Sequence, residues 1–230
     1  MPARNQILVF AKLPRAGRVK TRLVGTLSAQ EAAALHLACL RDTLRMVETF
    51  GGAEPRLLLA ADSRNAQRFA RRLGLGQNWQ VRTQGRGTLG ARLARAFRSG
   101  FLDGAERIIA VGSDSPWMGA RRLRAAFRAL TDADVVLGPA ADGGYYLVGA
   151  SRFLPELFEE IPWGSGHVLA ATLRALRGCG ASWRLLPRDF DLDRPADLRR
   201  AERWLRIRPK CCPALREWFA ERRGARTALR

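Results

Sequence analysis

The sequence has few cysteines and no long apolar run. Its four cysteines show no paired spacing of the kind that holds a metal, and the adjacent Cys211 and Cys212 have poor geometry for an ordinary disulfide. No stretch approaches the roughly 18 to 20 apolar residues of a membrane span, and the amino terminus shows no small-residue cleavage site of a signal peptide. We therefore expect a protein of the reducing cytoplasm without a transmembrane segment.

Acidic residues and lysine are both scarce. The chain has 21 Asp plus Glu against 40 Lys plus Arg, a net charge of +19, and only three of the 40 basic residues are lysines. So basic a chain attracts phosphates, nucleic acid or an anionic membrane surface. Two of the lysines, Lys12 and Lys20, fall within nine residues. This marks residues 12–22 as a segment where we expect a compact ammonium group to be needed for the chemistry.

The remaining composition is that of an ordinary globular protein. Hydrophobic residues make up 47% and charged residues 27% of the 230 residues, which excludes a disordered or collagen-like chain. We see no internal repeat and no low-complexity segment. The composition shifts only near Arg206, and from Arg199 to Arg230 the net charge is +8. We predict one domain over residues 1–206 and a basic C-terminal extension over residues 207–230.

Short runs rich in Val, Ile and Leu alternate with amphipathic stretches, which indicates strands alternating with helices. The predicted strands are Ile7–Ala11, Arg56–Ala61, Trp79–Thr83, Arg107–Val111, Ala133–Leu137, Tyr145–Val148 and Trp183–Leu186. The predicted helices are residues 28–50, with Ser28 and Glu31 as a capping box, Ser63–Leu73, Leu89–Leu102, Arg121–Leu130, Val168–Leu176 and Pro195–Leu205. This alternation predicts an α/β fold, a three-layer α/β/α Rossmann-like sandwich around a mostly parallel sheet. A site is then expected at the carboxyl ends of the strands.

The loop after the first strand has the composition of an anion cradle. Gly17 permits a positive φ and close approach of the backbone, and the basic groups supply the charge that a diphosphate requires. A P-loop needs glycine directly before Lys-Thr, but Val19 stands there, so we reject that motif. A solvated basic loop is the alternative. The residues expected to bind nucleotide phosphate here are Lys12, Gly17, Arg18, Lys20 and Arg22.

A second loop, Gln84–Leu93, contains G-x-G-x-x-G at Gly85, Gly87 and Gly90. This pattern suggests a dinucleotide fold, yet it normally belongs to the first strand-helix unit, and no acidic residue is placed for a ribose. We favour glycines that admit a nucleotide base or phosphate against the backbone, with Arg92 reaching back to the ligand.

A lone carboxylate, Asp114, follows the buried strand Arg107–Val111 in a turn set by Pro116. At the carboxyl end of a sheet and beside a phosphate cradle, it is well placed to hold Mg²⁺ or Mn²⁺, which bind one or two carboxylates plus ligand phosphates. The alternative is a role as an N-cap or turn former.

Both tyrosines of the chain follow an Asp-Gly-Gly sequence. Asp142, Gly143 and Gly144 precede Tyr145 and Tyr146 at the start of a predicted strand. The aromatic rings and hydroxyls suit a sugar or a base, whereas a simple hairpin turn is the alternative.

Two weaker groups follow. Asp191 and Asp193 lie on one side of an extended segment, where they could complete a metal site or orient an acceptor, although a helix start at Pro195 explains them equally well. Trp163 and Ser165 lie near His167, and a lone histidine is more often structural than catalytic.

These segments together resemble the bacterial glycosyltransferase-A-fold family of nucleotide-diphospho-sugar transferases, some of them associated with arsenosugar biosynthesis. The resemblance rests on three motifs of the family. The motif F-A-K-x-P-x-x-G-x-V-K-T-R-L is matched at Phe10–Leu23, G-[ST]-D-x-P at Gly112–Pro116, and D-G-G-Y-Y-L-[IV]-G at Asp142–Gly149. A thinner resemblance extends to molybdopterin-guanine and coenzyme F420 nucleotidyltransferases. Thr88 and Arg194 depart from the residues usual in these families.

The resemblance implies a cytoplasmic transferase that moves a sugar from a nucleotide-diphospho-sugar to a small-molecule acceptor. It implies Asp114 and Asp193 as metal ligands for Mg²⁺ or Mn²⁺ and Asp142 as the catalytic base. Gly143, Gly144, Tyr145, Trp163 and Ser165 would contact the acceptor. A base that deprotonates the acceptor hydroxyl implies inversion at the sugar.

Two other functions stay open at this stage. A nucleotidyltransferase could join a nucleoside triphosphate to a phosphorylated acceptor with the same cradle, releasing pyrophosphate. A nucleic-acid-binding module is motivated by the +19 charge, but no recognition helix or aromatic-basic stripe supports it, so we do not expect nucleic acid as a partner. The donor sugar, the acceptor and the oligomeric state are not encoded in these motifs.

Overall fold

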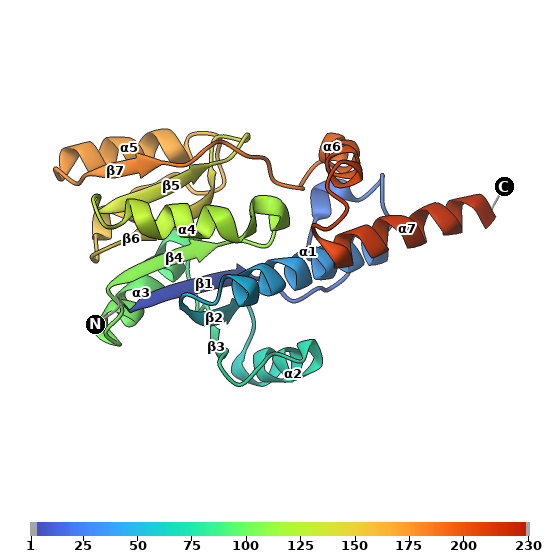
Figure 1. Ribbon diagram of the computed structural model, residues 1–230, viewed down its shortest axis with the longest axis horizontal. Helices are drawn as coiled ribbons and strands as arrows, with labels where there is room; N and C mark the ends of the chain where they lie inside the picture. Colours follow the sequence, from blue (N-terminus) through green and yellow to red (C-terminus); the bar gives the residue numbers. More distant parts are fainter. Residues whose placement is uncertain (1–3, 229–230) are drawn as a thin grey trace.

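A seven-stranded mixed sheet forms the centre of the molecule (Figure 1). The computed structural model describes residues 4–228, with side chains to residue 224. The strand order is β3-β2-β1-β4-β6-β5-β7, and all pairs are parallel except those of β6 with β4 and with β5. The strands are β1 (Asn5–Ala11), β2 (Glu54–Leu59), β3 (Gln80–Thr83), β4 (Arg107–Val111), β5 (Val135–Pro139), β6 (Tyr145–Ala150) and β7 (Trp183–Leu185). All seven predicted strands are confirmed, and so is the mostly parallel α/β fold.

The antiparallel strand β6 brings its first residues to the edge of the sheet where the parallel strands end. Val111, the last residue of β4, pairs with Leu147 near the start of β6. Because β6 runs against β4, the Asp-Gly-Gly turn before β6 lies at the same edge as the carboxyl end of β4. This reversal therefore places a β5–β6 loop among loops that follow parallel strands.

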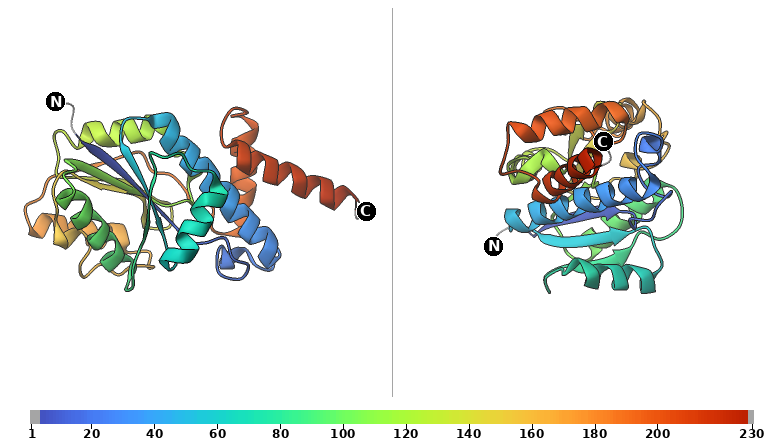
Figure 2. Two further views of the ribbon diagram at one scale, coloured as in Figure 1. Left: turned by 90° about the horizontal axis from the view of Figure 1, so that it is seen from below. Right: turned by 90° about the vertical axis from the view of Figure 1, so that its right-hand side faces the viewer.

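Alternating side chains of the strands pack into two separate cores, one on each face of the sheet. Ile7 and Val9 of β1 belong to one core, whereas Leu8 between them belongs to the other. The first core includes side chains of α1, α2 and α4, and the second includes side chains of α3 and α5. The molecule therefore has the three-layer α/β/α arrangement (Figures 1 and 2).

The helices follow the predicted pattern. They are α1 (Ala29–Phe50), α2 (Ser63–Leu73), α3 (Leu89–Leu102), α4 (Gly119–Ala129), α5 (Val168–Gly178), α6 (Pro195–Arg206) and α7 (Pro213–Ala228), with short 3₁₀ turns at Thr21–Leu23, Pro116–Met118 and Pro155–Leu157. The predicted capping box is present, because Ser28 accepts from the Glu31 amide at 3.1 Å and Glu31 accepts from the Ser28 amide at 2.7 Å. The helix α2 begins at Ser63 as predicted, but the residue that caps it is Asp62.

A third core joins the two C-terminal helices to α1. Leu215, Trp218 and Phe219 of α7 are buried in it, together with Leu198 of α6 and Leu35 of α1. The carboxylate of Asp42 in α1 accepts from the amides of Ala214 and Leu215 at 3.0 and 2.8 Å, which satisfies orphan donors at the start of α7. The first half of α7 thus packs on α1, and its distal half projects away from the sheet (Figures 1 and 2).

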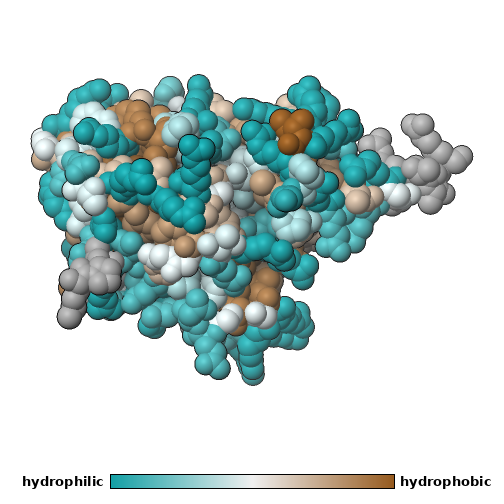
Figure 3. Space-filling view, in the orientation of Figure 1, coloured by the Kyte–Doolittle hydropathy of each residue, from teal (hydrophilic) through white to brown (hydrophobic). Residues whose placement is uncertain are grey.

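The predicted basic extension of residues 207–230 includes α7, and its last two residues lie outside the described part of the chain. Hydrophilic residues dominate the face of the molecule seen in Figure 3. Within residues 4–228, no helix is long and apolar enough to cross a membrane.

Candidate active site

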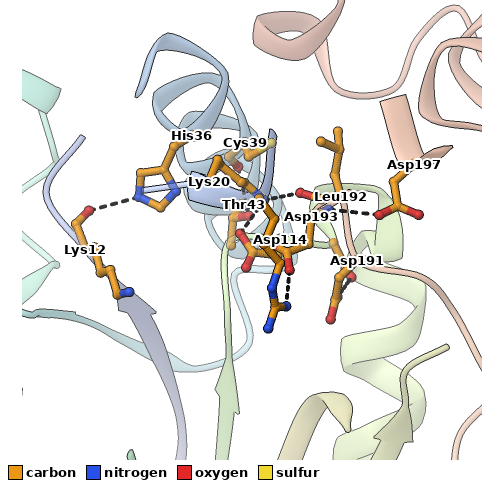
Figure 4. Close-up of polar contacts among 12 residues, drawn as sticks. Lys12, Lys20, His36, Cys39, Thr43, Asp114, Asp191, Leu192, Asp193 and Asp197 are labelled. Carbon is orange, nitrogen blue, oxygen red and sulfur yellow. Dashed lines mark hydrogen bonds and ion pairs between the residues drawn. The ribbon is translucent and has the colours of Figure 1, made fainter. Parts of the chain in front are cut away.

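Three segments that are distant in the sequence meet at the carboxyl end of β4. They are the basic loop after β1, the Gly112–Pro116 turn after β4, and the extended segment 189–193 before α6 (Figure 4). The Leu192 amide donates to the Asp114 carbonyl at 2.8 Å, and Ser115 Oγ donates to the Phe190 carbonyl at 2.9 Å. The Trp117 ring stacks on Phe190 at a centroid distance of 4.2 Å. The segment 189–193 is therefore held in a fixed position against the turn after β4.

Lys20 is the central contact between the basic loop and this turn. Its Nζ donates to Asp114 Oδ1 at 2.7 Å and also to the Leu192 carbonyl. The Lys20 side chain is 2% exposed, whereas the Asp114 side chain is 46% exposed. Burial disfavours the charge of the ammonium, but Asp114 outweighs it and raises the pKa of Lys20. Partial burial similarly opposes ionisation of Asp114, but Lys20 keeps the pKa of this carboxyl lowered.

Lys20 adopts a left-handed backbone conformation, with φ 49°. Non-glycine residues are uncommon there, and such strain is characteristic of functional sites. The buried His36 of α1 contacts the same loop, because its Nε2 lies 3.0 Å from the Lys12 carbonyl oxygen. Burial lowers the pKa of His36, which favours the neutral imidazole. His36 therefore supports the loop from α1; only its position on the buried face of a predicted helix could have indicated this from the sequence.

Asp191 lies beside Asp114 in the same cavity, and its Oδ1 lies 2.5 Å from Ser115 Oγ, so it shares the single hydroxyl proton of Ser115 with the Phe190 carbonyl. Burial, together with the negative charges of Asp114 and Asp142, raises the pKa of Asp191 to about 6 against the lowering effect of the Ser115 hydrogen bond. Asp193 has a different environment, since its Oδ2 accepts from Arg22 Nη1 at 2.6 Å and it does not line the cavity. The structure therefore brings Asp191, rather than the predicted metal ligand Asp193, into the cavity with Asp114.

A cavity of about 350 Å³ opens between the end of β4, the start of β6 and the loop before α5. Asp142 is exposed at this cavity, and its Oδ1 accepts from the Gly144 amide at 3.0 Å. Tyr145 and Trp163 meet edge to face, with ring centroids 5.9 Å apart. Of the predicted site residues, the cavity is lined by Arg22, Asp114, Asp142, Gly144, Tyr145, Trp163 and Ser165. The side chain of Ser165 donates to the Pro162 carbonyl at 2.7 Å and so supports its own loop.

Gly143 allows the loops on either side of the cavity to touch. Its φ is +91°, and a Cβ built on it would lie 2.0 Å from the Gly166 carbonyl oxygen. The Gly143 carbonyl also accepts from the Leu169 amide at 2.9 Å, at the start of α5. Gly143 is therefore required by packing between two loops, in addition to any contact with a ligand.

The other predicted binding residues do not line this cavity. Gly85 and Gly87 have positive φ values of 74° and 105° and form the loop before α3. Arg92 donates to the Gly87 carbonyl at 2.9 Å and to Gln84 Oε1 at 3.2 Å, so its guanidinium braces that loop. The exposed residues Lys12, Gly17 and Arg18 lie on the loop after β1. Their predicted contacts with phosphate stay predictions, as does the contact of Arg92 with a ligand.

Within residues 4–228, no three His, Cys, Asp or Glu side chains gather in a way that could hold a metal ion by themselves. Asp114 and Asp191 are two carboxylates in one cavity, and this donor set suits Mg²⁺ or Mn²⁺ that takes its other ligands from water and a phosphate. The residues present therefore fit a divalent cation that is bound together with a phosphorylated ligand.

Comparison with solved structures identifies proteins of the same fold. A putative nucleotide-diphospho-sugar transferase from Desulfovibrio desulfuricans G20 is 31% identical over 84% of this chain and 83% of its own, with a TM-score of 0.78. The 4-diphosphocytidyl-2C-methyl-D-erythritol synthase of Anaerococcus prevotii DSM 20548 is 11% identical over 89% of this chain and 97% of its own, with a TM-score of 0.59. Rv0371c of Mycobacterium tuberculosis H37Rv, solved with manganese, is 19% identical over 87% of this chain and 98% of its own, with a TM-score of 0.53.

The last two likenesses concern the fold alone, whereas the first extends to the sequence. Among curated proteins, none matches this chain. The profile of a bacterial family, described as uncharacterized proteins conserved in bacteria (DUF2064), matches residues 43–165, which include Asp114, Asp142, Tyr145 and Trp163. The chain has the glycosyltransferase-A-like fold of nucleotide-diphospho-sugar transferases. Because the family profile matches more than half of its residues, the chain belongs to the DUF2064 family.

Proposed function

We propose that this protein is a metal-dependent glycosyltransferase that moves a sugar from a nucleotide-diphospho-sugar to the hydroxyl of a small molecule. The observation that carries the proposal is the contact of Lys20 with Asp114, because it joins the basic loop to a carboxylate at the edge of the cavity. A diphosphate needs both cationic groups and a site for a divalent cation, and a sugar needs an adjoining cavity. The description of the relative from Desulfovibrio desulfuricans supports the same class of donor.

In this proposal Asp114 and Asp191 hold Mg²⁺ or Mn²⁺, which supplies positive charge to the diphosphate when it is bound. The manganese in the structure of Rv0371c supports this choice of metal. Lys20 fixes the orientation of Asp114, since its ammonium is buried and occupies one carboxylate oxygen. Asp193 serves a different purpose here, because its ion pair with Arg22 holds that guanidinium at the cavity.

The basic loop after β1 and the glycine loop before α3 bind the nucleotide part of the donor. Lys12 and Arg18 are exposed, so their charges are accessible to phosphate oxygens. Gly17, Gly85 and Gly87 have no side chain and positive φ values, so a phosphate or base can approach the backbone closely.

Asp142 acts as the general base. As the acceptor oxygen forms its bond to the anomeric carbon, Asp142 takes the hydroxyl proton, and the bond from that carbon to the diphosphate oxygen breaks. The nucleoside diphosphate leaves with the electron pair of that bond, and the cationic groups around it stabilise the developing charge. Attack opposite the leaving group gives inversion at the sugar.

Transfer of a nucleotidyl group is the second candidate, supported by the fold shared with a 4-diphosphocytidyl-2C-methyl-D-erythritol synthase. The same basic loop would then bind a nucleoside triphosphate, and pyrophosphate would leave. The two candidates differ in which nucleotide the protein prefers in the presence of metal.

A thermal-shift panel separates them. Purified protein with Mn²⁺ or Mg²⁺ is heated with nucleoside diphosphates, nucleoside triphosphates and nucleotide-sugars, because a ligand that binds the native state raises Tm. Metal-dependent stabilisation by one nucleoside diphosphate and its sugar conjugate supports glycosyl transfer. Stabilisation by triphosphates alone supports nucleotidyl transfer, and no response to any nucleotide contradicts both.

Asp114→Asn is the critical variant in this panel, because asparagine removes the charge and keeps an oxygen that can accept from the buried Lys20. The matched control is Asp132→Asn, which changes an exposed carboxylate in the turn after α4. The metal-dependent shift is expected to disappear in Asp114→Asn and to persist in Asp132→Asn.

A further inference from the structure

The cavity at the sheet edge has a polar mouth and an apolar interior. Asp142 is exposed and Asp114 is half exposed, so their carboxylates lie towards solvent. Leu93 and Val168 are both 5% exposed and Val148 is 3% exposed, so these side chains form the deeper wall. A volume of about 350 Å³ is sufficient for a small organic molecule. The cavity therefore fits a molecule with one polar end and one apolar end.

Leu89, the first residue of α3, gives an independent indication of an apolar ligand. It lines the cavity, and it is 45% exposed. Large apolar side chains exposed at the rim of a cavity gain free energy when a ligand removes them from water. Few large apolar side chains of the described chain are as exposed, and Leu89 is the one among them that lines this cavity.

The aromatic part of the wall is fixed in position. Trp163 donates from Nε1 to the Phe158 carbonyl at 3.2 Å and meets the ring of Tyr145 edge to face. A Cβ on Gly90 would lie 2.3 Å from Trp163 Nε1, so α3 packs directly against the indole. A wall that is rigid before binding costs little entropy on binding and suits a flat or bulky apolar group.

The charge near Asp142 disfavours a phosphate on the acceptor, although the whole chain is strongly basic. Three carboxylates line the cavity, those of Asp114, Asp142 and Asp191. Asp114 is paired with Lys20 and, with Asp191, is proposed to hold the cation of the donor diphosphate. Asp142 is proposed to face the acceptor, so a phosphate on the acceptor would meet a like charge, which costs binding free energy.

We infer that the acceptor is a phosphate-free alcohol with an apolar or aromatic body, whose body lies against Leu89, Leu93 and Trp163 and whose hydroxyl lies at Asp142. This inference rests on the proposed function, because the bound molecule is an acceptor only if the protein transfers a sugar. The cavity does not include Lys12, Gly85, Gly87 or Arg92, so its apolar part is available to a molecule other than the nucleoside that those residues are proposed to bind.

Two probes that differ only in a phosphate test the inference: 4-fluorophenethyl alcohol and 4-fluorophenethyl phosphate. Their binding to the full-length protein is measured by ¹⁹F NMR line broadening in metal-free buffer, without nucleotide. We expect the alcohol to bind at least about 10-fold more tightly than the phosphate, because like charges oppose the phosphate. Equal or tighter binding of the phosphate overturns the inference, and so does the absence of binding by both probes.

The matched variants are Leu89→Gln and Leu102→Gln, which replace two exposed leucines of the same helix, one in the cavity wall and one 81% exposed and remote from it. Leu89→Gln is expected to weaken binding of the alcohol about 5-fold, as expected for loss of apolar contact, and Leu102→Gln to leave it unchanged. Equal effects of the two variants would place the probe elsewhere and overturn the inference. Since this assay uses neither metal nor nucleotide, its failure is distinguishable from a failure of the nucleotide panel.

Discussion

The ammonium of Lys20 lies 2.7 Å from a carboxylate oxygen of Asp114, and the two partners differ sharply in exposure, with Lys20 2% and Asp114 46% exposed. The pair is therefore asymmetric. Lys20 depends on Asp114 for compensation of a charge that water does not reach, whereas Asp114 is partly solvated without Lys20. The contact also fixes the basic loop to the turn after β4, so it supports the site and the fold together.

The asymmetry predicts unequal costs for removing the two partners. Asp114→Ala leaves a buried ammonium without its counter-charge and is expected to lower the free energy of unfolding by about 3 kcal/mol or more. Lys20→Met leaves a half-solvated carboxylate, and a loss of about 1 kcal/mol is expected. Denaturant unfolding of both variants measures the difference. Equal losses, or a larger loss in Lys20→Met, would contradict this account of the pair.

Asp191 gives a prediction for pH dependence. Its pKa in the folded protein is raised to about 6, so the folded state holds a proton that the unfolded state has already released above pH of about 4. Stability from this group is therefore fully present below pH of about 4 and is lost as the pH rises to about 6. Asp191→Asn cannot ionise and escapes the loss.

We accordingly expect Asp191→Asn to be more stable than the wild type at pH 7.5 by about 3 kcal/mol, and the difference to vanish near pH 4. Urea unfolding in metal-free buffer at several pH values provides the measurement, with Asp132→Asn as the exposed control. A gain of the same size at both pH values would show that the effect does not come from ionisation of Asp191.

Much of the fold follows from local patterns. The alternation of Val, Ile and Leu runs with amphipathic stretches locates all seven strands, and the Ser28–Glu31 pair locates the start of α1. The residues of β6 do not indicate its direction, since a strand shows the same alternation either way. The only local signal is the Asp142-Gly143-Gly144 sequence, whose alternative interpretation as a hairpin turn agrees with the antiparallel pairing of β5 and β6. The direction brings Asp142 to the edge where β4 ends.

Local sequence patterns also predict part of the site. Glycines and charged residues after strands indicate which loops carry it, and Asp114, Asp142 and Trp163 do line one cavity. The choice between Asp191 and Asp193 depends on which way an extended segment turns against Ser115 and Arg22, and spacing does not report that. The burial of Lys20 is equally invisible in the sequence, because Lys12 lies in the same basic loop and is exposed.

The C-terminal helix provides a test of whether residues beyond 206 stabilise the fold. Leu215 is fully buried between α7 and α1, so Leu215→Ala is expected to lower the free energy of unfolding by about 2 to 5 kcal/mol. Leu102→Ala, at an 81% exposed leucine, should change it by about 0.5 kcal/mol or less. Thermal and denaturant unfolding measure both. A negligible effect of Leu215→Ala would indicate that α7 is a separate appendage.

Gly143 predicts a steric effect at the cavity. Gly143→Ala would place a Cβ 2.0 Å from the Gly166 carbonyl, whereas at Gly164, with a similar φ of +84°, a Cβ meets nothing within 4 Å. Gly164→Ala therefore costs only the backbone strain, about 1 kcal/mol. Gly143→Ala is expected to cost about 2 kcal/mol more because the two loops must separate. Unfolding of the two variants under one condition compares them directly, and equal costs would show that the loops are free to move apart.

Substitution of Asp142 tests the chemical step. If it removes the proton of the acceptor hydroxyl, Asp142→Asn is expected to lower kcat about 100-fold or more, because asparagine cannot take a proton. Binding of the nucleotide should change less than about twofold, since Asp142 lies at the cavity and outside the basic loop. The Oδ1 contact with the Gly144 amide can persist in asparagine, so the turn should retain its shape. NMR of the product then gives the configuration at the anomeric carbon, with Asp132→Asn as the control for kcat. A retained configuration, or turnover within a few fold of wild type, would assign the base to another residue.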